Sequence, residues 1–398
     1  MMIIALIGKP SVGKSTFFKA ATLADIEIAE RPFTTIKSNS GIGYVKIDCA
    51  DSFFKVQCNP RLGFCLNHKR FVPIDLMDIA GLVEGAHSGK GLGNEFLNDI
   101  READALIHII DISGSTNAQG EKVQPLTNNP IEDLKVIENE LDMWYYQILQ
   151  KGWEKFARTI SQEKKNIVIA LAKQLSGLKV TESHVENSIK KLNISEDPMT
   201  WSDNNLKELA TTLRKLSKPM IIAANKIDIQ GSQENLKKMQ KEFKDYEIIP
   251  CSADSELALR EASKNKLIEY IPGENDFKII NENITEQQSK ALTHIKENIL
   301  KKYKTTGLQE VLNKTVFNLL KYIAIFPGGL NNLKDSKGNI LPDCFLLPEE
   351  STALDFAFKL HTDIGNSFIK AIDVKTKKVI GKDHHLKNLD VIEIITKK

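Results

Sequence analysis

A short segment near the N-terminus restricts the possible fold more than any other part of the chain. An apolar run at residues 3–7 is followed by GKPSVGKS (8–15) and then by a helical pattern that extends to about residue 23. The segment fits the phosphate-binding pattern G-x-x-x-x-G-K-S/T, in which glycines let backbone N–H groups converge on phosphate oxygens. The helix that follows directs the positive end of its dipole at the anion. The segment therefore predicts an α/β domain that holds a nucleotide at this turn.

The residues of this turn, called the P-loop below, have different expected roles. Lys14 would place a cation on the β- and γ-phosphates, and the Ser15 hydroxyl would ligate Mg²⁺. The backbone amides of the loop would surround the other phosphate oxygens. The residues expected to contact the nucleotide here are Gly8, Lys9, Pro10, Ser11, Val12, Gly13, Lys14, Ser15 and Thr16.

Two segments at the ends of later strand patterns indicate which base is bound. NKID (225–228) and CSA (251–253) each follow an apolar run. The Asp228 carboxylate can accept hydrogen bonds from N1–H and the 2-amino group of guanine, a donor pair that adenine lacks. An open α/β sheet binds ligands at the carboxyl ends of its strands. We therefore expect GTP or GDP, with the base held by Asn225, Lys226, Asp228, Ser252 and Ala253, and with the Ala253 N–H facing the guanine O6.

Two other segments are expected to respond to the terminal phosphate. DIAG (78–81) follows the strand pattern FVPIDLM, so Asp78 would hold Mg²⁺ through a water molecule and the Gly81 N–H would meet the γ-phosphate. RPFTTIKS (31–38) lies where a GTPase needs a threonine that closes on Mg²⁺ and this phosphate. Thr34 and Thr35 are the candidates, and we favour Thr35.

These roles give two functional sets. The expected catalytic residues are Lys14, Thr35 and Gly81, and the expected Mg²⁺ ligands are Ser15, Thr35 and Asp78.

Strand and helix patterns alternate along the first 111 residues and again from residue 219, which predicts a mostly parallel, doubly wound sheet. More than a hundred residues with little strand signal separate Asp111 from Pro219, far more than a parallel crossover needs. Apolar residues at 130–160 follow a helical spacing. We therefore expect a helical insertion, with the aromatic cluster at 144–146 and 153 in its core.

The remainder of the chain predicts two further parts. Helical patterns at 286–303 and 307–323 precede short strand-like pieces around one helix-like piece. The expected units are a discontinuous nucleotide-binding domain (1–111 and 219–265), a helical insertion (112–218), a helical connector (266–323) and a small α+β domain (324–398). From residue 285 onward the chain has an excess of five positive charges, which weakly favours an anionic partner for the C-terminal part.

Composition excludes some classes of protein. The apolar run at the N-terminus breaks at Gly8, far short of a membrane span or a signal peptide. Five cysteines in 398 residues do not form a disulfide framework. We therefore expect a cytoplasmic protein without a membrane partner.

The segment DIAGLVEGAHSGKGLGNEFL (78–97) resembles the Obg-like GTPases, and within them the YchF branch, with its archaeal members closest. GKPSVGKST, RPFTTIKSNSG and the late segments FPGG, STALDFAFKLHTDIG, FIKAID and LKNLDVIEII support this resemblance. It implies an α/β P-loop NTPase fold with a helical insertion and a C-terminal β-grasp (TGS) domain. It also implies a translation-associated GTPase that contacts ribosomes or RNA.

Three positions qualify what the resemblance implies. Many YchF proteins carry an altered base motif and prefer ATP, whereas this chain has the full guanine signature with Asp228. Leu82 stands where Ras-like enzymes have a water-orienting Gln, and it cannot hydrogen-bond a water molecule. We therefore expect slow intrinsic hydrolysis, with the rate supplied by a partner, a metal ion or a switch residue such as Glu84 or His87. Relatives that use K⁺ usually have Asn at the position of Ser11, so the resemblance does not imply K⁺ dependence.

A weaker constellation consists of Cys49, Cys58, Cys65 and His68. Four such ligands suit zinc. No C-x₂-C pair is present, however, so incidental thiols are the more common explanation for this pattern, and Mg²⁺ is the one metal that we predict.

Our leading hypothesis is a GTP hydrolase that acts as a ribosome-associated molecular switch. Two alternatives remain open at this point: an ATPase of the same fold, and a ribosome- or RNA-binding scaffold that nucleotide only stabilises.

Overall fold

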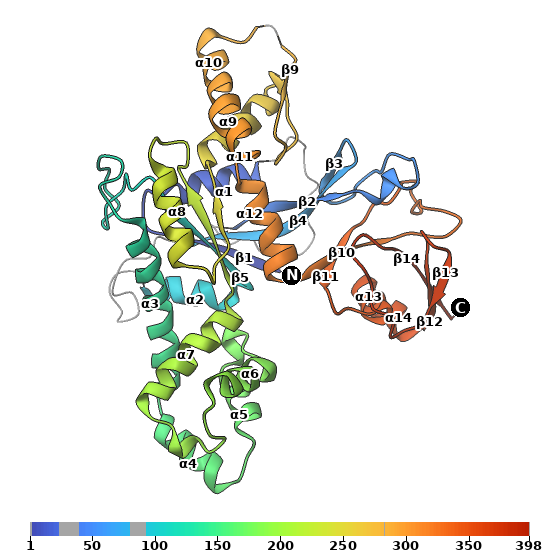
Figure 1. Ribbon diagram of the computed structural model, residues 1–398. Coiled ribbons are helices and arrows are strands. Elements are labelled where there is room, and N and C mark those ends of the chain that lie inside the picture. Colours follow the sequence, from blue (N-terminus) through green and yellow to red (C-terminus); the bar gives the residue numbers. More distant parts are fainter. Residues whose placement is uncertain (1, 24–39, 80–92, 282, 398) are drawn as a thin grey trace.

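A seven-stranded, mostly parallel sheet forms the centre of the structure, a computed structural model that describes residues 2–23, 40–79, 93–281 and 283–397 (Figure 1). Neighbouring strands follow the order β2 (Ser40–Asp48), β4 (Lys69–Asp78), β1 (Ile3–Ile7), β5 (Ala105–Asp111), β6 (Met220–Asn225) and β7 (Ile248–Pro250). The five strands from β4 to β7 are parallel, and β2 and β3 (Phe64–Leu66) each pair antiparallel with β4. The predicted α/β fold class is confirmed.

Helices cover both faces of this sheet. Alternate residues of each strand point to opposite faces, so each face packs against its own set of helices and forms its own hydrophobic core. Ile107 and Ile109 of β5 pack with α1 (Lys14–Thr22) and α12 (Leu308–Lys314), whereas Leu106 and Ile110 pack on the opposite face. Every residue of β5 is buried, as expected for a central parallel strand. The other helices next to the sheet are α2 (Gly93–Glu102), α8 (Ser232–Glu242) and α9 (Ala253–Lys264).

Five helices lie between β5 and β6 and project from one end of the sheet (Figure 1). They are α3 (Pro130–Gln150), α4 (Trp153–Gln162), α5 (Ile167–Gln174), α6 (Glu182–Leu192) and α7 (Asp203–Ser217), with short 3₁₀ turns η3 (Ser176–Leu178) and η4 (Pro198–Thr200). The aromatic side chains expected in a core are buried here, and Trp153 stacks on Trp201 with 5.3 Å between ring centroids. Gly152, at a φ of 77°, separates α3 from α4.

A hairpin and a broken helix follow α9. The hairpin consists of β8 (Ile268–Glu269) and β9 (Lys278–Ile279), which no strand pattern in the sequence had indicated. The predicted helix at 286–303 is α10 (Glu286–Ile295), a π-helical turn η5 (Lys296–Leu300) and α11 (Lys301–Tyr303). These elements lie at the end of the sheet opposite to the five-helix region (Figure 1).

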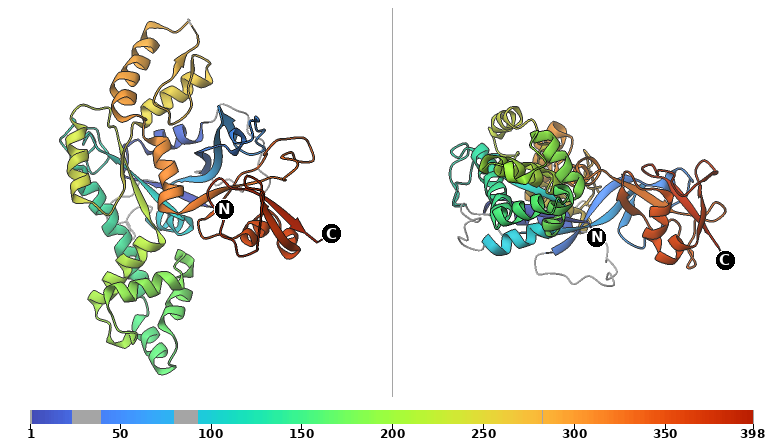
Figure 2. Two further views of the ribbon diagram at one scale, coloured as in Figure 1. Left: turned by 45° about the vertical axis from the view of Figure 1, so that its right-hand side comes forward. Right: turned by 90° about the horizontal axis from the view of Figure 1, so that it is seen from below.

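The C-terminal residues form a separate five-stranded sheet, to one side of the central sheet (Figure 2). Its order is β11 (Phe345–Pro348), β10 (Tyr322–Pro327), β14 (Val391–Thr396), β12 (Phe368–Asp373) and β13 (Lys378–Ile380), with helices α13 (Ala353–Leu360) and α14 (Thr362–Asn366).

The predicted helix at 307–323 extends too far. The helix ends with a π-helical turn, η6 (Thr315–Leu319), and Lys321 adopts a left-handed φ of 54° that no regular helix continues. The apolar residues after it form β10, whose pairing with β14 only the tertiary structure supplies. Within the part of the chain described, no helix is both long and apolar enough to cross a membrane.

Candidate nucleotide-binding site

The P-loop connects β1 to α1 with a backbone path that requires its glycines. Gly13 has a φ of 94°, and a Cβ atom there would lie 2.3 Å from the Asn225 side-chain nitrogen. A Cβ atom on Gly8 would lie 2.5 Å from the backbone oxygen of Ile109. Both positions therefore exclude a side chain, and the loop amides lie at the N-terminal end of a nine-residue helix. This cradle fits the phosphates of a nucleotide.

Lys14 and Asp78 come together at the end of the sheet. Parallel pairing of β1 with β4 places Leu6 opposite Asp78, so the end of β4 lies beside the P-loop. The Lys14 ammonium forms an ion pair with the Asp78 carboxylate, and both side chains are mostly buried. Ser15 follows in the first turn of α1 with its side chain exposed. The Lys14–Asp78 pair thus lies beside the first turn of α1, which carries the Ser15 hydroxyl. Mg²⁺ and a phosphate chain require a carboxylate, a hydroxyl and a cation of this kind.

Asn225 connects the P-loop to the start of α9. Its side-chain nitrogen donates to the backbone oxygen of Val12 at 2.8 Å, and its side-chain oxygen accepts from the Ala253 N–H at 2.9 Å. Asn225 is buried, as is Ser252, whose hydroxyl caps α9. The Ala253 N–H that we expected to face the guanine O6 is therefore already used within the protein. The next amide in this first turn, that of Asp254, has no acceptor among the described residues.

The Asp228 side chain is exposed, in the turn that follows β6. No described residue donates a hydrogen bond to its carboxylate. Lys226, two residues earlier, adopts a left-handed φ of 63° and directs its ammonium to Asp111 at 2.9 Å. The segment therefore keeps one carboxylate available to a ligand while its lysine stabilises the loop.

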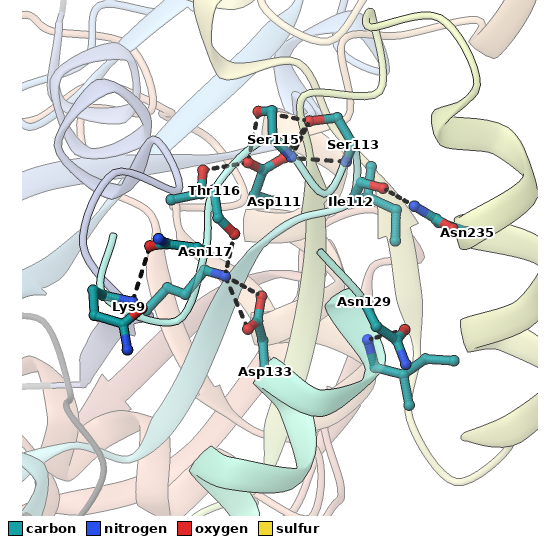
Figure 3. Close-up of polar contacts among 12 residues, drawn as sticks. Lys9, Asp111, Ile112, Ser113, Ser115, Thr116, Asn117, Asn129, Asp133 and Asn235 are labelled. Carbon is teal, nitrogen blue, oxygen red and sulfur yellow. Dashed lines mark hydrogen bonds and ion pairs between the residues drawn. The ribbon is translucent and has the colours of Figure 1, made fainter. Parts of the chain in front are cut away.

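Asp111, which the sequence analysis did not single out, organises this side of the site (Figure 3). It is fully buried at the end of β5 and accepts hydrogen bonds from the hydroxyls of Ser113, Ser115 and Thr116. Burial by itself would raise the pKa of Asp111, but these hydrogen bonds and the Lys226 charge outweigh it and lower the pKa. The available signal was its position at the carboxyl end of a buried parallel strand.

The Lys9 side chain is directed at Thr116 and Asp133 (Figure 3). Its ammonium donates to the backbone oxygen of Thr116 at 2.8 Å and lies 2.7 Å from a carboxylate oxygen of Asp133. Burial raises the pKa of Asp133, against the effect of Lys9. Lys9 thus connects the P-loop to α3, and of its groups we expect only the backbone N–H to contact phosphate.

His108 of β5 is buried and lines the same small cavity as Lys9 and Asp133. Burial, together with the charge of Lys9, lowers the pKa of His108 to about 3, so its ring is neutral at physiological pH. Its Nδ1 atom has no hydrogen-bond partner in the part of the chain that the structure describes.

Several predicted residues lie outside the described residues. They are Thr34, Thr35, Gly81, Leu82, Glu84 and His87. Of the predicted set, the structure brings together the P-loop, Asp78, the 225–228 turn and the start of α9 at one edge of the sheet.

Family models match three stretches of the chain. A model described as 50S ribosome-binding GTPase matches residues 3–173. A model described as Obg-like GTPase YGR210-like, G4 motif-containing domain, matches residues 223–328, and a TGS domain model matches residues 336–396.

Individual proteins match over nearly the whole chain. An uncharacterised GTP-binding protein of Methanocaldococcus jannaschii is 48% identical over 399 residues, covering 100% of this chain and 99% of its own. The crystal structure of a GTP-binding protein from Pyrococcus horikoshii superposes with a TM-score of 0.79 at 38% identity, covering 100% of both chains. The ribosome-binding ATPase YchF of Buchnera aphidicola (Schizaphis graminum) is 27% identical over 374 residues, covering 92% of this chain and 86% of its own.

Proposed function

Because the chain belongs to the Obg-like GTPases, in the YchF family with a G domain and a TGS domain, we propose that it hydrolyses GTP as a ribosome-associated molecular switch. The observation that supports this proposal most is the arrangement at the end of β6. Asn225 connects this turn to the P-loop, and Asp228 extends beyond it with an exposed carboxylate.

The proposed guanine site uses Asp228 and the first turn of α9. The carboxylate would accept from N1–H and the 2-amino group, and the Asp254 N–H would donate to O6 in place of Ala253. Asn225 would hold the two segments together through its bond from the Ala253 N–H, while Lys226 and Ser252 would stabilise their own segments through bonds to Asp111 and Ser255. Adenine presents neither the donor pair nor the oxygen, so the site should discriminate against ATP.

The proposed phosphate site consists of the P-loop amides of residues 8–16 and Lys14. Ser15 and Asp78, with Thr35 from the segment outside the described residues, would hold Mg²⁺. When bound, Mg²⁺ neutralises charge on the phosphate oxygens. Lys14 would contribute positive charge at the same location, and the Gly81 N–H would donate a hydrogen bond to the γ-phosphate.

Slow turnover in the isolated protein is part of the proposal. Leu82 follows Gly81 and cannot orient a water molecule by hydrogen bonding, so a partner would have to complete the reaction. We propose the ribosome as that partner. This is supported by the name of the family model over residues 3–173, by the name of the Buchnera relative and by the positive C-terminal part. The helices between residues 112 and 218 and the domain from 324 would convey the nucleotide state.

An ATPase is the second candidate function, since YchF relatives are named ribosome-binding ATPases. The test is to measure affinity and turnover for GTP, GDP and ATP on the full chain with Mg²⁺, before and after ribosomes are added. We expect GTP to bind at least 100-fold more tightly than ATP, and ribosomes to raise turnover. Asp228→Ala should lose this preference, whereas Glu234→Ala, an exposed acid on α8, should keep it.

Two outcomes would contradict the proposal. Equal affinity for ATP and GTP in the wild-type protein would establish the ATPase instead. Ribosome binding that is the same with GTP and GDP, without faster turnover, would favour a scaffold that nucleotide only stabilises.

A further inference from the structure

A cluster of metal-ligand side chains lies outside the nucleotide site, between β2 and β4. One ligand atom from each of Cys49, Asp51, Cys58 and Cys65 lies within 4.8 Å of all the others. Cys49 directly follows β2, Asp51 lies in the 3₁₀ turn η1 (Ala50–Ser52), and Cys65 lies in β3. His68, grouped with the cysteines by sequence, is not part of this set and contacts Asp51 instead.

The spacing of the sulfur atoms suits a shared metal ion. The Sγ atoms of Cys49 and Cys58 are 3.6 Å apart. Two thiolates on a tetrahedral zinc, each about 2.3 Å from the metal, lie about 3.8 Å apart, whereas a disulfide needs about 2.05 Å. A thiol–thiol hydrogen bond would explain one close pair. It would not explain why a third sulfur and a carboxylate converge on the same location.

The carboxylate of Asp51 is held in place for a ligand role. It is completely buried, and Oδ2 accepts from the Cys58 N–H at 3.0 Å. Its other oxygen lies 2.9 Å from Nδ1 of the half-exposed His68 ring. Asp51 Oδ2 also lies 3.9 Å from the Cys65 sulfur. A ligand supported by outer hydrogen bonds is the usual construction of a protein metal site.

The surroundings provide positive charge for a thiolate-rich site. Arg70 is buried, and one of its guanidinium nitrogens lies 3.7 Å from the Cys58 sulfur. Among the described residues no carboxylate pairs with it. A thiolate is the form of cysteine that binds metal.

The segment that carries the cluster has little regular secondary structure. No helix or strand lies between η1 and β3, and Phe53 and Leu62 expose their side chains there. The same segment nevertheless contacts the C-terminal part of the chain. The amides of Asn59 and Arg61 donate to the backbone oxygens of Ile340 and Pro342, each at 2.9 Å.

Arg70 connects the cluster directly to this contact. While one guanidinium nitrogen lies near Cys58, the same group donates to Leu341 O at 3.1 Å and Pro342 O at 2.7 Å. Any change of charge or position at Cys58 therefore acts on the residues that seat the C-terminal domain against β4.

We propose that Cys49, Cys58, Cys65 and Asp51 bind one Zn²⁺. This ion holds residues 49–68 in the conformation that contacts residues 340–342 of the C-terminal domain. His68 is a positioning residue, because it acts through the Asp51 carboxylate. This site is independent of the proposed GTPase activity, so either proposal can fail without the other.

The first test is metal content. Full-length protein purified under reducing conditions with Zn²⁺ present, then dialysed without a chelator, should retain about one zinc per chain by elemental analysis. The same protein stripped and refilled with Co²⁺ should show the absorption bands of tetrahedral cobalt with thiolate ligands. Zinc well below one per chain, together with no thiolate bands, would overturn the proposal.

Variants identify the ligands. Cys58→Ser and Cys65→Ser should each lower zinc affinity at least 100-fold, and Asp51→Ala should lower it more than His68→Ala, for which we expect about 10-fold. Cys344→Ser is the matched control, because Cys344 lies outside the cluster. This variant should bind zinc as tightly as the wild type. Equal affinity in all variants would contradict the assignment.

The stripped wild-type protein tests the structural role without any substitution. Removing zinc should accelerate amide hydrogen exchange at residues 53–63 and 340–343 and leave GTP affinity unchanged. Thiol alkylation and mass measurement on protein kept without oxidant should find three more reactive thiols after stripping than in the zinc-loaded protein. A Cys49–Cys58 disulfide under those conditions, or unchanged exchange at both segments, would overturn the proposal.

Discussion

The side-chain amide of Asn225 donates a hydrogen bond to the main-chain oxygen of Val12 at 2.8 Å, and so joins two segments 213 residues apart in sequence. The same side chain accepts from the Ala253 N–H at 2.9 Å. One buried residue therefore sets the distance between the phosphate cradle and the turn that carries Asp228. The position of a base relative to its phosphates depends on this connection.

Replacing Asn225 should affect nucleotide binding more than stability. Asn225→Ala leaves a buried oxygen and a buried N–H without partners, each costing roughly 1–3 kcal/mol. We expect GTP affinity to fall 30- to 1000-fold by isothermal titration calorimetry. Asn235→Ala, which removes a comparable 3.0 Å hydrogen bond to Ile112 O but no contact to the P-loop or α9, should change affinity less than threefold. Equal losses in both variants would show that the effect is general destabilisation.

The requirement for glycine at position 13 can be tested by adding one methyl group. Gly13→Ala should abolish measurable GTP binding, because the new Cβ would lie 2.3 Å from the Asn225 nitrogen at a φ of 94°. Gly177→Ala is the control, since no atom lies within 4 Å of its added Cβ. Thermal melts of both variants should show that Gly13→Ala remains folded. Normal GTP binding by Gly13→Ala would mean that the loop adapts freely.

Asp228 can be tested by matching a different base. Asp228→Asn replaces an acceptor with a donor, so it should lose guanine and gain xanthine, whose 2-oxo group accepts a hydrogen bond. We expect GTP affinity to fall at least 50-fold while XTP affinity rises above that of the wild type, measured by competition. Should the variant bind GTP as before, Asp228 would not read the base.

The two P-loop lysines should differ in their effect on GTP affinity. Lys9→Met leaves Asp133 without its cation and should lower the free energy of unfolding by roughly 2–4 kcal/mol, with GTP affinity changed less than tenfold. Lys14→Met should lower GTP affinity more than 100-fold, and it should also lower the free energy of unfolding because it leaves Asp78 without its cation. The double variant Lys9→Met/Asp133→Leu should recover stability, as measured by urea unfolding. A large loss of GTP affinity in Lys9→Met would mean that its ammonium contacts phosphate.

Acid sensitivity should depend on His108. Its pKa is lowered to about 3 in the folded protein, so the unfolded chain binds more protons between pH 6.5 and 3. The free energy of unfolding should therefore fall as pH decreases through this window, by roughly 3–5 kcal/mol from this group at most. His108→Met should flatten the pH dependence of Tm, whereas His294→Met, at an exposed histidine, should not. Parallel curves for wild type and His108→Met would contradict the assignment.

Local patterns were sufficient for the parts of the fold that depend on neighbouring residues. The strand before the P-loop, the helix after it and the long helical region between β5 and β6 lie where hydrophobic spacing predicted them. The first two residues of β10 (Tyr322–Pro327) were wrongly assigned to a helix, because an apolar run after a helix looks the same in either state until β14 pairs with it.

The sequence by itself determined the kind of ligand, because glycines, a lysine and an Asn-Lys-x-Asp run carry their chemistry wherever the chain places them. Only the tertiary structure decided which groups remain available to that ligand. In the folded protein Lys9 forms an ion pair with Asp133, and the Ala253 N–H donates to the Asn225 side chain. The Asp228 carboxylate stays exposed. The tertiary structure also places Asp51 beside the three thiols, where the sequence had suggested His68, which contacts Asp51 instead. Spacing along the chain does not determine these partners, because each depends on which distant polar group the fold places within hydrogen-bond distance of a buried atom.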